Sequence, residues 1–179
     1  LGNVISPVDI VKEYGTDAMR YYVARELSTF EDSDVTMEKF KESYNANLAN
    51  GIGNLTSRIM KMAVTYGVEL DAKDKEVEYY SKSAGFEENE NWKGFNLGKE
   101  MDDIWLSVKS LDEYIQKEEP FKKIKINPEE AKANVKYLLV HLFGISLRLE
   151  PILPETSEKI KALIKENKVP ETPLFVRKD

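Results

Sequence analysis

Cysteine is absent from the 179 residues of the sequence, and histidine occurs once, at His141. Without cysteine the chain can form no disulfide, thiolate metal site or thiol nucleophile. One imidazole leaves no obvious histidine metal site, and the apolar run around His141 favours a hydrogen-bonded core histidine over a catalytic one. The sequence also lacks an apolar run long enough to span a bilayer and a basic-then-apolar leader. These absences predict a soluble protein with no membrane partner.

Recognisable catalytic motifs are missing as well. The sequence has no glycine-rich phosphate loop, no Ser-His-Asp or Cys-His set and no HExxH motif. Acid pairs at residues 102–103 and 118–119 occur in ordinary helix-surface contexts. The acidic cluster of Glu87, Glu88 and Glu90 lacks the spacing and glycine of a calcium loop, so we interpret it as part of a solvated loop. We expect no catalytic residue and no metal site in this chain by itself.

Basic residues are outnumbered: 26 lysines and arginines face 32 acidic residues, which gives a net charge of −6. A protein whose whole surface grips a nucleic-acid backbone is normally basic. Any contact with nucleic acid must therefore be local, and directed at bases more than at phosphates.

Helical periodicity dominates what is present. Apolar residues recur at helical steps, and proline, threonine and asparagine residues stand where helices begin. Helices are expected to begin near Pro7, Thr16, Thr36, Leu97, Pro128 and Pro154. Residues 68–95 are polar and irregular and are expected to form a loop. With no convincing strand pair, the pattern predicts an all-α fold, an antiparallel bundle of about five helices.

The stretch from Thr36 to Gly67 is expected to be one long helix, bent near Gly51 and Gly53. It carries two stripes about 115° apart at 100° per residue, so the two cannot serve the same surface. The apolar stripe is Leu48, Ile52, Leu55, Ile59 and Met62, and the polar stripe is Asn47, Asn50, Asn54 and Arg58. Three asparagines within a helix lower its stability, which suggests a binding role. The alternative is a solvated flank with a kink.

Two further features bear on interactions. Phe121 follows Pro120 at a helix end and precedes Lys122, Lys123 and Lys125. This arrangement could stack a base and hold phosphates, or the aromatic side chain could close the core at the helix end. The helices at 7–14 and from Thr16 carry tyrosines, including Tyr21 and Tyr22, that need covering. We expect these tyrosines to be exposed here and to dock against whatever precedes Leu1.

The order of several motifs resembles the C-terminal part of methionyl-tRNA synthetase. The segments, over nearly the whole chain, are LGNVISPVDIVKEYGTDAMRYYVARE, FKESYNANLANGIGNLTSR, YIQKEEPF, LEPILPETSEKI and TPLFVRKD. LGNV and YGTDAMRYY are shared by several class I synthetases, whereas the Asn-Leu-x-x-Arg step, the Pro-aromatic pair and the Pro-Leu-Phe ending in this order indicate the methionine enzyme. The start at Leu1, without Met, suggests a piece of a longer protein.

The resemblance implies two parts, a stem-contact-like helical segment at residues 1–34 and an α-helical anticodon-binding domain at 35–179. It implies a tRNA(Met) anticodon stem-loop and the N-terminal catalytic domain of the same protein as partners. ATP and Mg would belong to that catalytic domain, so no cofactor is expected in this chain, which alone would be inactive. A cytoplasmic location follows from the family. The alternatives are the corresponding domain of an Ile, Val or Leu synthetase, and a non-catalytic helical protein-interaction domain.

The resemblance also assigns site residues. Asn54 and Arg58 would hydrogen-bond the anticodon bases CAU, and Phe121, where the family usually has Trp, would stack on a base. Candidate anticodon-binding residues are Asn47, Asn50, Asn54, Arg58, Pro120 and Phe121, and candidate phosphate contacts are Lys61, Lys122, Lys123 and Lys125. Phe121 lacks the indole donor, and Asp112 stands where relatives often carry Asn, as a carboxylate that would repel phosphate.

Overall fold

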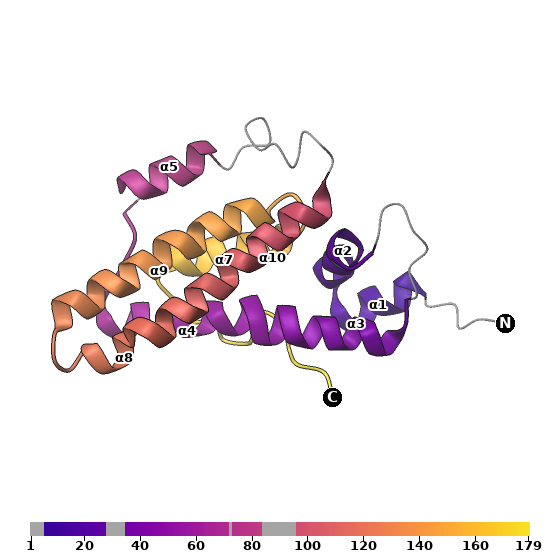
Figure 1. Ribbon diagram of the computed structural model, residues 1–179, viewed down its shortest axis with the longest axis horizontal. Helices are drawn as coiled ribbons and strands as arrows, with labels where there is room; N and C mark the ends of the chain where they lie inside the picture. The colour runs from indigo at the N-terminus through magenta and orange to yellow at the C-terminus, as the bar shows by residue number, and fades with distance from the viewer. Residues whose placement is uncertain (1–5, 28–34, 72, 84–95) are drawn as a thin grey trace.

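The computed structural model describes residues 6–27, 35–71, 73–83 and 96–179, and within them it contains helices and no strand (Figure 1). The helices are α1 (Pro7–Tyr14), α2 (Thr16–Arg25), α3 (Met37–Ser43), the π-helical η1 (Tyr44–Gly53), α4 (Asn54–Tyr66), α5 (Lys75–Ser83), α7 (Leu97–Glu118), α8 (Pro120–Lys123), α9 (Pro128–Leu149) and α10 (Pro154–Glu166). The predicted all-α fold is confirmed. No helix in these ranges is long and apolar enough to cross a membrane.

Helix α9 is the centre of the bundle. It contacts α4, α5, α7, α8 and α10, and it runs antiparallel to α7 and α10 (Figure 1). Its buried residues are Ala131, Asn134, Val135, Leu138, Leu139, Val140, Leu142, Gly144, Ile145, Ser146 and Leu149. Because these lie on most sides of the helix, neighbours can pack around it, as the nearly all-apolar sequence predicted. His141 is half-buried, and its Nδ1 lies 2.9 Å from the Tyr137 carbonyl oxygen.

Among the described residues, three helices begin at a side-chain cap, and two of these caps, Thr36 and Asn127, stand where helix starts were predicted. The side chains of Thr36, Asn96 and Asn127 each accept a hydrogen bond from the backbone N–H three residues on, at 3.2, 3.2 and 3.3 Å. Such caps satisfy N–H groups that have no partner inside the helix. At Glu119 the backbone turns to a positive φ of 43°, and Pro120 then opens the short helix α8.

The long helix is continuous from α3 through η1 to α4 and bends where the two glycines predicted. Gly51, with φ −82° and ψ −108°, departs from helical geometry. A Cβ at Gly53 would lie 2.9 Å from the Leu48 carbonyl oxygen, so only glycine fits there. All five residues of the predicted apolar stripe are buried, with at most 8% of any one exposed.

The C-terminal tail crosses the bent helix and is fixed to it by ring packing and hydrogen bonds, which together are called the C-terminal clasp. Phe175 is buried against Tyr44, with ring centroids 5.9 Å apart. The Tyr44 hydroxyl donates to the Val176 carbonyl at 2.9 Å. Asn45 and Lys178 exchange two hydrogen bonds, at 2.7 and 2.9 Å, between the amide side chain and the backbone. The tail therefore packs on the bundle.

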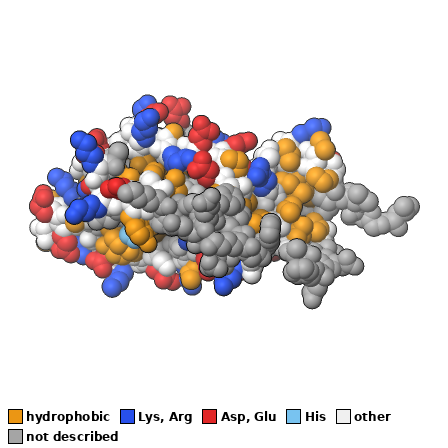
Figure 2. All heavy atoms as spheres, turned by 90° about the horizontal axis from the view of Figure 1, so that it is seen from above, with side chains coloured by type: hydrophobic (Ala, Val, Ile, Leu, Met, Phe, Trp, Pro, Cys, Tyr) orange, Lys and Arg blue, Asp and Glu red, His pale blue; other side chains and the backbone are white. Residues whose placement is uncertain are grey.

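The expectation that Tyr21 and Tyr22 are exposed is wrong. They are 1% and 5% exposed, because Tyr22 packs on Phe40 of α3 and Tyr21 on Trp105 of α7. Residues distant in the sequence supply this cover. Hydrophobic side chains do gather over α1 and α2 in Figure 2, and the large exposed ones in these helices are Val8, Val11 and Val23. The proposed division between residues 34 and 35 adjoins residues outside the described ranges and stays a prediction.

The loop predicted at 68–95 is wrong in part, because Lys75–Ser83 forms α5. This helix packs on α9, where Val77 is buried. One short apolar face is enough to dock a helix that is otherwise polar. Glu87, Glu88 and Glu90 lie outside the described residues.

A Gly144→Ala substitution should displace α5 from α9. The added Cβ would lie 2.7 Å from two carbon atoms of the Tyr80 ring. We expect a loss of about 1–2 kcal/mol in the free energy of unfolding, with faster amide exchange confined to α5. In the control, Gly98→Ala, the nearest atom is the Ala24 carbonyl oxygen at 3.9 Å. That variant should be neutral or stabilised by up to about 1 kcal/mol. Equal exchange throughout the bundle in both variants would contradict the prediction.

Candidate nucleic-acid interface

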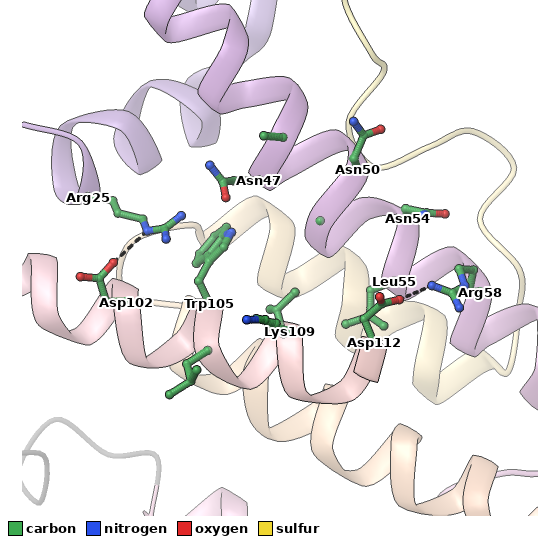
Figure 3. A pocket seen from close by; sticks show the side chains of 14 residues that line it. Arg25, Asn47, Asn50, Asn54, Leu55, Arg58, Asp102, Trp105, Lys109 and Asp112 are labelled. Atoms are coloured by element: carbon green, nitrogen blue, oxygen red, sulfur yellow. Dashed lines mark hydrogen bonds and ion pairs between the residues drawn. The ribbon is translucent and has the colours of Figure 1, made fainter. Parts of the chain in front are cut away.

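A groove of about 530 Å³ lies between the bent helix and α7, open at the surface (Figure 3). One wall is the predicted polar stripe, because Asn47, Asn50, Asn54 and Arg58 all line the groove. The opposite wall comes from α7 between residues 102 and 112, and Arg25 of α2 closes one end. The structure thus brings four sequence-predicted residues to one surface.

The asparagine side chains are available for a ligand. Asn50 and Asn54 are exposed, and neither side chain makes a hydrogen bond to another part of the chain that the structure describes. Asn47 is half-buried, and its Nδ2 lies 3.4 Å from the Ser43 Oγ. Each amide offers both donors and an acceptor. This wall can therefore pair with the edge of a planar polar group.

Arg58 is held by a carboxylate from the opposite wall. Its Nη1 forms an ion pair with the Asp112 Oδ1, across 54 residues of sequence. The other oxygen of Asp112 accepts a hydrogen bond of 2.6 Å from the Gln116 amide. Both partners of the ion pair remain more than one-third exposed, so water weakens the pair. Asp112 thus positions the guanidinium at the groove edge.

A second, more apolar pocket of about 370 Å³ adjoins the groove at Arg58. Its other lining residues are Lys61, Met62, Thr65, Tyr66, Ile115 and Phe121. Phe121 is 45% exposed, so the alternative in which it closes the core is wrong, whereas Pro120 before it is buried. The turn at Glu119 and Pro120 directs the ring outwards. Phe121 therefore shares one continuous surface with Arg58 and the asparagines.

The candidate phosphate contacts divide into two kinds. Lys122 pairs with Glu119, and Lys123 pairs with Glu118 at 2.7 Å and Glu130 at 2.6 Å. Hydrogen bonds to these two carboxylates raise the pKa of Lys123 above its ordinary value. Both lysines are thus partly neutralised within the protein. Lys61 and Lys125 are exposed, and Lys61 lies at the pocket beside Phe121.

Sequence reasoning placed Trp105 in the core and missed its position at the groove. Trp105 is 7% exposed, yet it lines the groove, and its Nε1 has no hydrogen-bond partner among the described residues. Arg25, also missed, lies 5.2 Å from the Trp105 ring centroid and donates to Asp102 at 3.1 Å and to the Tyr21 hydroxyl at 2.8 Å. In the sequence Trp105 was only an aromatic residue within an apolar helical stripe, which is typical of a core. Nothing in the sequence connected Arg25 with it.

The described residues offer no group of three or more His, Asp and Glu side chains that could hold a metal ion. The surface combines amides, guanidinium groups, lysines, carboxylates and exposed aromatic area. Chemically it can hydrogen-bond and stack a planar polar group.

Comparison with known proteins shows which family the chain resembles. The model of the class I tRNA synthetases (M) matches residues 1–60. The methionine–tRNA ligase of Clostridium acetobutylicum is 34% identical over 169 residues, which are 89% of this chain and 26% of that protein. The enzyme of the same name from Synechocystis sp. is 30% identical over 169 residues, 89% of this chain and 32% of that protein.

Solved structures share the fold. Mycobacterium tuberculosis methionyl-tRNA synthetase in its free state superimposes with a TM-score of 0.76 at 21% identity, over 99% of this chain and 42% of that one. The same enzyme in complex with methionyl-adenylate gives 0.76 at 22% identity, over 99% and 40%. The chain spans about a quarter to a third of the length of its curated relatives. Along most of its residues the chain therefore resembles the curated methionine–tRNA ligases.

Proposed function

We propose that this chain recognises the CAU anticodon of tRNA(Met) and serves as the anticodon-binding portion of a methionyl-tRNA synthetase. The observation that carries the proposal is the shared surface of Asn54, Arg58 and Phe121 along the groove and its adjoining pocket. The resemblance to the methionine–tRNA ligases supplies the class of ligand. A protein-interaction scaffold would need no such row of amides, of which Asn50 and Asn54 make no side-chain hydrogen bond to the described residues.

The chemistry of the surface suits unstacked bases. Proteins read RNA sequence mainly in single-stranded loops, by stacking and by hydrogen bonds to base edges. Arg58 supplies donors only, whereas Asn54, one helical turn away, supplies donors and an acceptor. The exposed ring of Phe121 offers a stacking face at the Arg58 end. Pro120 sets the direction of that ring, and Asn47 and Asn50 extend the amide row.

Phosphate contacts play a smaller part in this proposal. With a net charge of −6 the chain attracts the RNA backbone weakly. Of the four candidate lysines, Lys61 and Lys125 are the ones we propose to contact phosphates, because Lys122 and Lys123 are engaged by carboxylates. Specificity would therefore come from bases.

The partners proposed for the parent enzyme follow from the family. That enzyme would use ATP and Mg in its catalytic domain to join methionine to tRNA(Met), and the present chain would select the tRNA. Exposed Val8, Val11 and Val23 on α1 and α2 form the surface that we propose for contact with the catalytic domain. A cytoplasmic location remains a prediction.

Asn54→Ala and Arg58→Ala should each lower the affinity for a CAU anticodon stem-loop at least about tenfold, because each removes hydrogen bonds to a base. Fluorescence anisotropy of a labelled stem-loop at fixed salt measures this, with a loop of altered anticodon beside it. Arg177→Ala is the matched control, since it removes the same charge from an exposed site outside the groove.

The control variant should keep both its affinity and its preference for CAU. If the Asn54→Ala and Arg58→Ala variants both bound the CAU stem-loop as tightly as the wild-type protein, the assignment of the site would be wrong. If wild-type protein bound both loops equally and lost them on added salt, the proposal of anticodon reading would be wrong.

A further inference from the structure

The Trp105 indole N–H is a buried donor from which no described residue accepts a hydrogen bond. Its Nε1 is shielded from solvent and has no hydrogen-bond partner among the described residues. A buried donor without a partner is costly, and most buried polar groups in native proteins are paired. The indole N–H therefore calls for an explanation outside the core.

The ring is fixed, so the donor cannot turn to find a partner within the bundle. On one side Trp105 meets the Tyr21 ring, with centroids 4.8 Å apart. The Arg25 guanidinium lies 5.2 Å from the indole centroid and is itself held by Asp102 and the Tyr21 hydroxyl. These contacts preorganise the direction of the N–H.

That direction is toward the groove wall at the bend. In Figure 3 the nitrogen-bearing edge of Trp105 faces the bent helix, on the side of Asn47. Gly51 stands opposite, and a Cβ at this position would lie 3.9 Å from Nε1. Because glycine carries no side chain, only its backbone faces the donor at this position. Trp105 and Gly51 both line the groove.

Resting on the proposed function, we infer that Trp105 donates its indole hydrogen to a second base of the anticodon loop, beside the base that Asn54 and Arg58 bind. Gly51 and Arg58 are seven residues apart, roughly 10 Å along the helix, so the two positions serve different bases. An indole donates only, so the partner is a base carbonyl oxygen or ring nitrogen. Because Asp102 and Asp112 line the groove beside Arg25, Arg58 and Lys109, its charge does not by itself select a phosphate, and the test below distinguishes a base from the backbone.

The direct test observes the indole N–H of wild-type protein by ¹H–¹⁵N NMR during titration with a CAU stem-loop. Trp92→Phe assigns the signal, because the chain has two tryptophans. We expect the chemical shift of the Trp105 indole proton to move downfield when the CAU loop is added. It should stay unchanged when a loop of altered anticodon is added. This measurement needs no change at Trp105.

The second part of the test measures the affinity of variants for the CAU stem-loop. Trp105→Phe keeps an aromatic ring but has no donor, and should weaken CAU binding about three- to tenfold. Leu106→Ala is the control, because Leu106 lines the same groove, is 62% exposed and offers no hydrogen bond. Stem-loops with one base removed at a time then locate the partner. For one abasic loop the penalty of Trp105→Phe should vanish, as in a double-mutant cycle.

Each other outcome is decisive. An unmoved indole signal with wild-type affinity of Trp105→Phe, while CAU preference persists, overturns this inference and leaves the proposed function standing. An equal penalty with every abasic loop would place the acceptor on the ribose-phosphate backbone and overturn the base assignment. Absence of CAU preference in wild-type protein removes the proposed function, and this inference with it.

Discussion

An Arg148→Ala variant is expected to lose about 3–5 kcal/mol of its free energy of unfolding, because the buried carboxylate of Glu100 would lose its cation. Glu100 is 0% exposed, and its Oε1 accepts from the Arg148 Nε at 3.0 Å and Nη2 at 2.9 Å. The pair joins α7 to α9, the central helix. Thermal unfolding followed by circular dichroism should show a melting temperature lower by about 10 °C.

The double variant Glu100→Leu with Arg148→Met is the control for this prediction. It removes both charges and fills their volume with apolar atoms, a change that is often neutral or stabilising. Most of the stability lost in Arg148→Ala should therefore return. A double variant as unstable as Arg148→Ala would show that packing, and not the broken ion pair, causes the loss.

An Asp17→Ala variant should lose about 2–4 kcal/mol, because Asp17 caps a helix that lies far away in the sequence. Its Oδ2 accepts hydrogen bonds of 2.7 Å from both the backbone N–H and the hydroxyl of Thr156, in the first turn of α10. The carboxylate also lies at the positive end of that helix. Asp17 is 5% exposed, so water would replace it poorly. Chemical denaturation measures the loss.

Thr156→Val separates the two hydrogen bonds at this cap. It removes the hydroxyl and keeps the backbone bond, so its loss should be about 1 kcal/mol. If Thr156→Val were as destabilised as Asp17→Ala, the hydroxyl alone would account for the effect. An Asp17→Ala variant of wild-type stability would mean that α10 needs no cap from α2.

The helical periodicity of apolar residues was sufficient to predict most of the fold. The apolar stripe from Leu48 to Met62 and the caps at Thr36 and Asn127 depend on residues within a few positions of each other, so the sequence alone predicts them. Helix α5 was missed because its own sequence is mostly polar and its helicity depends on docking against α9. Cover for Tyr21 was missed for a related reason, since Trp105 lies 84 residues further on.

The candidate site, too, has a part that the sequence predicts and a part that depends on tertiary contacts. The spacing of Asn47, Asn50, Asn54 and Arg58 predicted one face of one helix, and these residues do line one groove. Local charge pairs such as Lys122 with Glu119 lie within reach of a sequence pattern, whereas pairs between different helices do not. The carboxylate that positions Arg58 comes from α7, and Glu130 reaches Lys123 from the start of α9. Which cations stay available for a ligand depends on tertiary contacts that no local pattern encodes.

The C-terminal clasp bears on the order in which the molecule assembles. Asn45 and Lys178 are 133 residues apart, so their two hydrogen bonds close a very long loop. Loop closure costs entropy before such distant contacts return any stability. Helices joined by short turns should therefore collapse first, and the tail should lock against η1 afterwards. The bend that forms the groove wall would then become rigid in the final step of folding.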